Sequence, residues 1–109
     1  MIDIKYTDEN GVLGVTIKGH ADSAPEGEDL ICAMATGLAY TLAQNVKDER
    51  LGLKGRPKIH LNEGDIVVKC RPKDKHREQF ELIYGVICKG YRMMAKNFPD
   101  NLCYHSDKE

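Results

Sequence analysis

The start of the chain predicts two strands joined by a tight turn. Apolar and polar residues alternate over residues 2–7, so every second side chain fits one buried face of a strand. Asn10 and Gly11 follow, and both tolerate the positive φ that a tight turn requires. The alternation resumes over residues 12–19, with Leu13, Val15 and Ile17 on one face. We therefore expect a β-hairpin.

A loop and an apolar helix are predicted next. Residues 19–27 are rich in Gly, Ala, Pro and acidic side chains, which is typical of a mobile loop. Asp29 is a good helix N-cap, because its carboxylate can accept from the free N–H groups of a first turn. Residues 30–46 carry no charge, and apolar or small residues cover almost every side. This pattern predicts a buried helix, held by the sheet or by a partner. Gly37 is costly inside a helix, and close approach of another backbone would explain it.

The second half repeats the same order. Residues 58–61 and 65–70 predict another hairpin around residues 62–64. Apolar side chains then recur at three- and four-residue spacing from Phe80 to Met94, which predicts an amphipathic surface helix. Pro99 ends it, and the tail from residue 100 has little pattern. The order ββαββα indicates an α+β fold: a mostly antiparallel four-stranded sheet packed with one buried and one amphipathic helix.

Composition narrows the class of protein. A chain of 109 residues is expected to form a single domain, residues 1–109. Its net charge of −1 gives no basic surface for nucleic acid, so we expect no direct nucleic-acid partner. No stretch approaches the roughly 20 apolar residues that span a bilayer, and the start lacks the layout of a signal peptide. We expect no membrane partner and a cytoplasmic location, where thiols stay reduced.

The cysteines are widely spaced. Cys32, Cys70, Cys88 and Cys103 contain no Cys-x-x-Cys, so the sequence suggests neither a disulfide framework nor a structural zinc site. We expect no cofactor and no metal. Cys70 and Cys88 lie among apolar neighbours and are interpreted as core residues. Cys103 and His105 form an i, i+2 pair in the tail that could hold only a stray metal ion.

His20 and Cys32 are the best candidates for catalysis. His20 directly follows a predicted strand, and Cys32 is the third residue of the predicted helix. A thiolate there would face the positive end of the helix dipole, which lowers the pKa of a cysteine. The N–H groups of Cys32 and Ala33 could receive an oxyanion, and the imidazole could act as base. A free cysteine is also among the most buried residue types, so a plain core role stays open.

Two short motifs make the catalytic interpretation more specific. The first is Gly-His-Ala at residues 19–21, and the second is Gly-Glu-Asp-Leu-Ile-Cys-Ala at residues 27–33. Together they resemble the ribosomal-processing cysteine protease family of bacteria. Its signature is Gly-His-Ala, a short flexible loop, then Gly-x-Asp-aliphatic-aliphatic-Cys-Ala opening a helix. The spacing of twelve between histidine and cysteine agrees, as do chain length and element order.

The resemblance implies a role for each matched residue. Cys32 would attack the scissile carbonyl, and His20 would take the thiol proton and return it to the leaving amine. Gly27 would let the loop hinge, and Asp29 would fix the start of the helix that presents Cys32. Members of the family remove a short N-terminal extension from a large-subunit ribosomal protein, cut after paired aromatic residues, and act as homodimers.

Two positions depart from the family pattern. Thr36 stands where the family usually has serine, and Met34 is larger than the usual residue. Both could change the shape of the substrate pocket. Two other functions compete with the peptidase: a non-enzymatic ribosome-associated binding module, and a thiol redox protein that uses Cys32. A pure binding module does not need this His–Cys spacing, and a redox protein would want a resolving cysteine close by.

Overall fold

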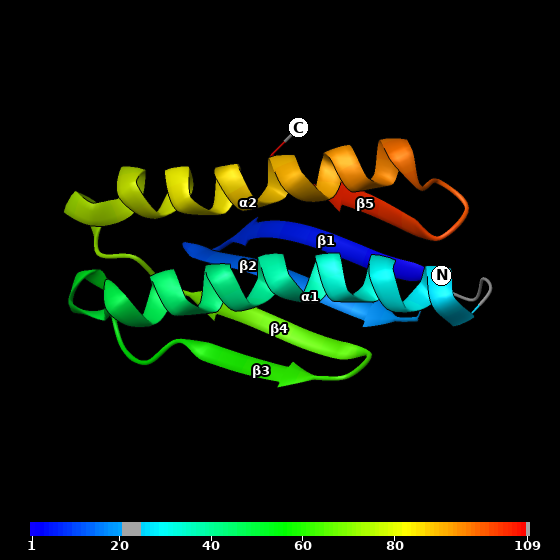
Figure 1. Cartoon of the computed structure of the whole chain (residues 1–109). Coiled ribbons are helices and arrows are strands. Elements are labelled where there is room, and N and C mark those ends of the chain that lie inside the picture. Colours follow the sequence, from blue (N-terminus) through cyan, green and yellow to red (C-terminus); the bar gives the residue numbers. More distant parts are fainter. Residues whose placement is uncertain (21–24, 109) are drawn as a thin grey trace.

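One mixed sheet of five strands carries two helices on the same face (Figure 1). The structure is a computed structural model that describes residues 1–20 and 25–108, with the backbone alone for residues 25–29. The strands lie in the order β3-β4-β2-β1-β5. The elements in chain order are β1 (Ile2–Glu9), β2 (Val12–Gly19), α1 (Pro25–Asp48), β3 (Lys58–Asn62), β4 (Asp65–Cys70), α2 (Arg77–Asn97) and β5 (Leu102–Ser106), with short 3₁₀ turns at Arg50–Gly52 and Asp74–His76.

The first hairpin forms as predicted and sets the register of the sheet. Glu9 pairs with Val12 next to the turn, and Ile2 pairs with Gly19 at the opposite end of the hairpin. The alternating apolar side chains of both strands are buried on the face that the helices cover. The second hairpin, β3–β4, joins the sheet through antiparallel pairing of β4 with β2. The predicted α+β class is confirmed.

The fifth strand corrects the predicted count of four. β5 lies in the stretch that we expected to be a tail, and it pairs with β1 in parallel, Ile2 beside Leu102. Leu102 is buried under α2. A strand of five residues is stabilised here by its neighbour in the sheet, which lies a hundred residues away, and local pattern cannot report that contact.

Helix α1 begins earlier than predicted. It starts at Pro25, where proline suits a first helical turn, instead of at Leu30. Asp29 is therefore the fifth residue of the helix, and the prediction that it caps the helix is wrong. The part of the predicted loop at residues 21–24 lies outside the described residues.

Helix α1 was predicted to be buried by the sheet or by a partner, and this chain buries only part of it. One side is buried in the core, but Leu30, Met34 and Tyr40 are exposed. No atom lies within 4 Å of a Cβ built on Gly37, so close approach of another backbone does not explain that glycine. Helix α2 is amphipathic, as expected, with Phe80, Tyr84, Ile87, Tyr91 and Met94 buried.

Two buried tyrosines tie α2 to its neighbours. The Tyr84 hydroxyl donates to the Val68 carbonyl at 3.0 Å, which joins α2 to β4. The Tyr91 hydroxyl donates to the Ala35 carbonyl at 2.9 Å, which joins α2 to α1. Burial raises the pKa of both phenols, so both remain protonated donors. Among the described helices, none has the length and apolarity needed to cross a membrane.

Candidate active site

His20 is held at the end of β2 by the backbone around it. The N–H of Gly19 donates to the Gly64 carbonyl at 3.1 Å, and the N-terminal amine of Met1 donates to the His20 carbonyl. The imidazole lies against Gly64, in the turn between β3 and β4. A Cβ built on Gly64 would stand only 2.6 Å from Nε2 of His20. The site thus depends on a glycine that sequence analysis did not single out. Its place in the predicted turn at residues 62–64 was the available signal, and the structure gives it a positive φ.

Cys32 reaches the same place from α1. Its side chain is half-buried and packs against the core beside Ile31. His20 and Cys32 line one small cavity of about 60 Å³, together with Thr36, Glu63 and Gly64. The structure therefore brings together the two predicted catalytic residues and Thr36, one helical turn after Cys32. A thiol and an imidazole on one cavity wall provide the nucleophile and the base of acyl transfer.

The early start of α1 changes the surroundings of Cys32. Cys32 is the eighth residue of the helix, and the dipole effect fades beyond the first turn. The predicted stabilisation of the thiolate by the helix N-terminus is therefore wrong. The N–H groups of Cys32 and Ala33 lie inside the helical hydrogen-bond ladder, so the predicted oxyanion site at these two groups is wrong as well.

Ala33, another predicted supporting residue, does not line this cavity. Ala33 faces a different pocket on the far side of α1. Only the backbone of Gly27 and Asp29 is described, and the role of Gly27 as a hinge stays a prediction.

The remaining cysteines differ from Cys32 in their surroundings. Cys70 and Cys88 are buried, which confirms their interpretation as core residues. Burial raises the pKa of the Cys70 thiol. Cys103 is half-buried, and burial together with the neighbouring Asp3 carboxylate raises the pKa of its thiol. Each of these shifts disfavours a thiolate.

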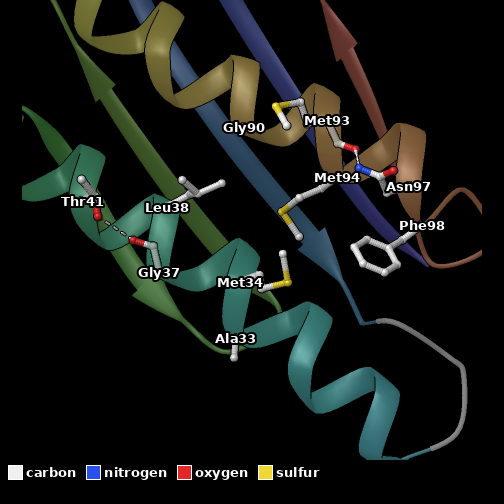
Figure 2. A pocket seen from close by; sticks show the side chains of 10 residues that line it. All are labelled: Ala33, Met34, Gly37, Leu38, Thr41, Gly90, Met93, Met94, Asn97 and Phe98. Carbon is white, nitrogen blue, oxygen red and sulfur yellow. Dashed lines mark hydrogen bonds between the residues drawn. The ribbon is translucent and has the colours of Figure 1, made fainter.

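A larger apolar groove lies on the other side of α1. It has a volume of about 570 Å³ and is lined by ten residues of α1, α2 and the residue that follows α2. Figure 2 shows Met34 of α1 and Met94 of α2 pointing toward one another, with Phe98 beside them. We call this the α1–α2 groove. It does not contain His20 or Cys32, but Ala33 on its wall is the next residue after Cys32.

Fold and site together are those of a small α+β cysteine peptidase. The family model described as "Cysteine protease Prp" matches residues 1–103, and the chain belongs to this family. A curated relative, the ribosomal processing cysteine protease Prp of Staphylococcus aureus, is 24% identical over 102 residues, which are 93% of this chain and 92% of the relative. The protein is therefore a cysteine-type peptidase, a hydrolase, which decides against the binding-module and redox alternatives.

Two solved structures share the fold. A Streptococcus mutans protein superposes with a TM-score of 0.72 at 22% identity, covering 97% of this chain and 93% of that one. The ribosomal processing protease Prp of S. aureus, solved with a covalently linked product peptide, gives a TM-score of 0.71 at 21% identity, covering 98% of this chain and all of that one.

Proposed function

We propose that this protein is a cysteine endopeptidase that removes a short N-terminal extension from a large-subunit ribosomal protein, with Cys32 as nucleophile and His20 as base. The observation that carries the proposal is the shared cavity. The two side chains come from separate elements, β2 and α1, and line the same small space in a member of the Prp family.

The two groups suffice for peptide hydrolysis in two steps. His20 takes the proton of the Cys32 thiol, and the thiolate attacks the scissile carbonyl carbon. The imidazolium then gives its proton to the leaving amine as the C–N bond breaks, which leaves a thioester on Cys32. Water, deprotonated by His20, attacks the thioester and releases the new carboxylate. Thr36, one helical turn after Cys32, lines the same cavity and brings a hydroxyl-bearing side chain to it.

The α1–α2 groove is suited to apolar side chains of the extension. A helix with its side chains is about 10 Å across, so an extended peptide crosses α1 in about three residues. Substrate side chains about three residues away from the cut would therefore reach Met34 and Met93. These methionines are 48% and 63% exposed, and flexible thioethers adapt to aromatic rings. Met93→Ser should raise KM with little change in kcat. Leu51→Ser is the control, because Leu51 is 82% exposed and does not line the groove.

Three further proposals accompany the activity. Residues 1–109 act as one domain, since a single core cluster joins both helices to the sheet. The enzyme works in the cytoplasm, where ribosomal proteins are made and where its four thiols stay reduced. It acts as a homodimer, as the family resemblance implies. The exposed Leu82 and Val86 on α2 offer apolar surface to a second copy, and the mass in solution tests this.

The decisive experiment mixes the purified protein with each large-subunit ribosomal protein of its host and detects cleavage by mass spectrometry. We expect loss of a short N-terminal peptide that ends in aromatic residues. Cys32→Ala and His20→Ala should each abolish the cut, with losses far from additive because the pair works as a unit. His60→Ala is the matched control, since His60 is exposed in the middle of β3 and lies outside the cavity.

The proposal fails if no extension is cut, or if Cys32→Ala cuts as well as the parent. Equal loss in His20→Ala and His60→Ala would also contradict it. Cys32→Ala should still bind the uncut substrate, so capture of the complex separates loss of chemistry from loss of folding.

A further inference from the structure

A second group of reactive side chains lies at the β1–β5 edge, away from the peptidase cavity. Asp3 on β1 pairs with Cys103 on β5, and His105 follows two residues later. Ile2, Ile4 and Leu102, the neighbours of these residues along the two strands, point into the core under the helices. Because side chains alternate along a strand, all three members of the group lie on the opposite face of the sheet. One ligand atom from each side chain lies within 4.8 Å of the other two. Parallel pairing of two strands distant in sequence thus assembles sulfur, nitrogen and oxygen at one point.

The contacts within this trio already converge on one carboxylate oxygen. The Cys103 thiol donates to Oδ1 of Asp3 at 3.1 Å, and Nε2 of His105 lies 3.5 Å from the same oxygen. Lys5 approaches the other oxygen, Oδ2, at 3.9 Å. A tetrahedral zinc ion with ligand bonds of about 2.0–2.3 Å holds its ligand atoms about 3.3–3.8 Å apart. The ligand atoms of the trio are therefore close to metal-binding spacing. An ion would use Oδ1 of Asp3, whereas Lys5 approaches the other oxygen, Oδ2.

We propose that Asp3, Cys103 and His105 bind one zinc-class divalent ion, which fastens β5 to β1. The ion takes the place of the thiol proton: Cys103 loses H⁺ to solvent and ligates as thiolate, with neutral His105 and the Asp3 carboxylate completing three protein ligands. Water fills the fourth position. Thiolate, imidazole and carboxylate together suit Zn²⁺ and its spectroscopic substitute Co²⁺ better than Mg²⁺ or Ca²⁺, which prefer all-oxygen sites. The proposal does not depend on the proposed peptidase substrate.

The test uses full-length protein carrying Cys32→Ala, because Cys32 and His20 would otherwise offer a competing sulfur and nitrogen. Titration with Co²⁺ should give a near-ultraviolet thiolate-to-metal band that saturates at one ion per chain. Adding Cys103→Ser should remove the band. His105→Gln should weaken binding by at least about tenfold, since even loss of a partner outside the ligand set costs that much. His60→Gln, an exposed histidine outside the trio, should leave binding unchanged.

Zn²⁺ provides an independent readout. It should raise the melting temperature of the Cys32→Ala protein, because the ion binds only when β1 and β5 are paired, and the rise should vanish with Cys103→Ser. No Co²⁺ band, an equal band with Cys103→Ser, or equal affinities for the His105→Gln and His60→Gln proteins would each overturn the proposal. His105 is exposed, so its substitution tests the site without loss of folding.

Discussion

The two ends of the β1–β2 hairpin are held by different kinds of contact. At the turn end, the Asp8 carboxylate is only 17% exposed and accepts from Nη2 of Arg77 at 2.6 Å and from Nζ of Lys108 at 3.1 Å. Glu81 joins the same group through Lys108 at 3.2 Å. The hydrogen bond from Arg77 holds the pKa of the Asp8 carboxyl below its usual value. This end is fixed by charge.

At the other end the ion pair of Lys18 with Asp65 is exposed to solvent, and the His20 side chain is placed by shape. Among the described residues, the side chains of His20 and Cys32 have no ion pair, and the imidazole rests on Gly64. We call this the catalytic end, after the proposed roles of His20 and Cys32, and no strong side-chain partner from the described residues competes there with a substrate. The comparison teaches that a change of charge at the turn end should cost stability, while a change of shape at the catalytic end should cost activity.

Outside the His20–Cys32 pair itself, the largest expected effect comes from one added methyl group at residue 64. Gly64→Ala would put a Cβ 2.6 Å from Nε2 of His20, so the ring must move. A displacement of about 1 Å in a catalytic group can cost roughly 100-fold in rate, and we expect a loss of that order in kcat/KM for peptide cleavage.

Gly55→Ala is the matched control for this experiment. Gly55 has φ +76° against +71° for Gly64, so alanine carries the same backbone strain, but nothing lies within 4 Å of the added Cβ. Both variants should lose similar stability in denaturant, and only Gly64→Ala should lose activity. Equal kinetic losses would mean that strain, and not the imidazole, is responsible.

At the turn end, Asp8→Asn should lower the free energy of unfolding at neutral pH by about 1–2 kcal/mol, because Arg77 and Lys108 lose their anion. The folded pKa of Asp8 lies below the unfolded value, so its contribution is present above pH of about 4 and is lost as pH falls through the folded pKa. Urea unfolding of both proteins from pH 7 down to pH 3 should show the difference shrinking. Cleavage should hardly change; a large kinetic loss would erase the contrast between the two ends.

The smallest expected effect tests how α2 supports the catalytic end. Tyr91→Phe removes the hydrogen bond to Ala35, three residues after Cys32, and Tyr84→Phe removes the one to Val68 in the sheet. Each should cost about 1 kcal/mol in thermal or urea unfolding. Only Tyr91→Phe should also alter cleavage, by a few-fold at most. Equal kinetic behaviour would show that α1 needs no such anchor.

Local pattern was sufficient for the elements whose partners are near in sequence. The first hairpin was predicted from alternation and its Asn-Gly turn, and the buried face of α2 from its three- and four-residue spacing. His20 and Cys32 were singled out from their places at a strand end and in a helix, and then chosen because the two motifs around them resemble a protease family; both line the cavity. For the hairpin and for α2 the sequence was sufficient, because the apolar pattern of each element repeats within a few residues.

The structure differs from the predictions at three places, and at two of them the cause is a contact between residues distant in sequence. β5 is a strand because it pairs with β1, and the pattern of its own five residues does not predict this pairing. The start of α1 was predicted at Leu30 because a good capping residue, Asp29, stands before it, but the helix begins at Pro25. Gly64 went unnoticed because its importance comes from the imidazole that packs on it, which is 44 positions earlier in the chain.

The parallel pairing of β1 with β5 has a consequence for the order in which the chain is made. β1 leaves a ribosome about a hundred residues ahead of β5, so β1 exposes an unpaired edge while the residues between the two strands are made. The other side of β1 is covered as soon as β2 follows. One edge of the nascent sheet therefore stays unpaired until residues 102–106 emerge. Until then, the strand edge next to Ile2 is available to any other extended chain nearby.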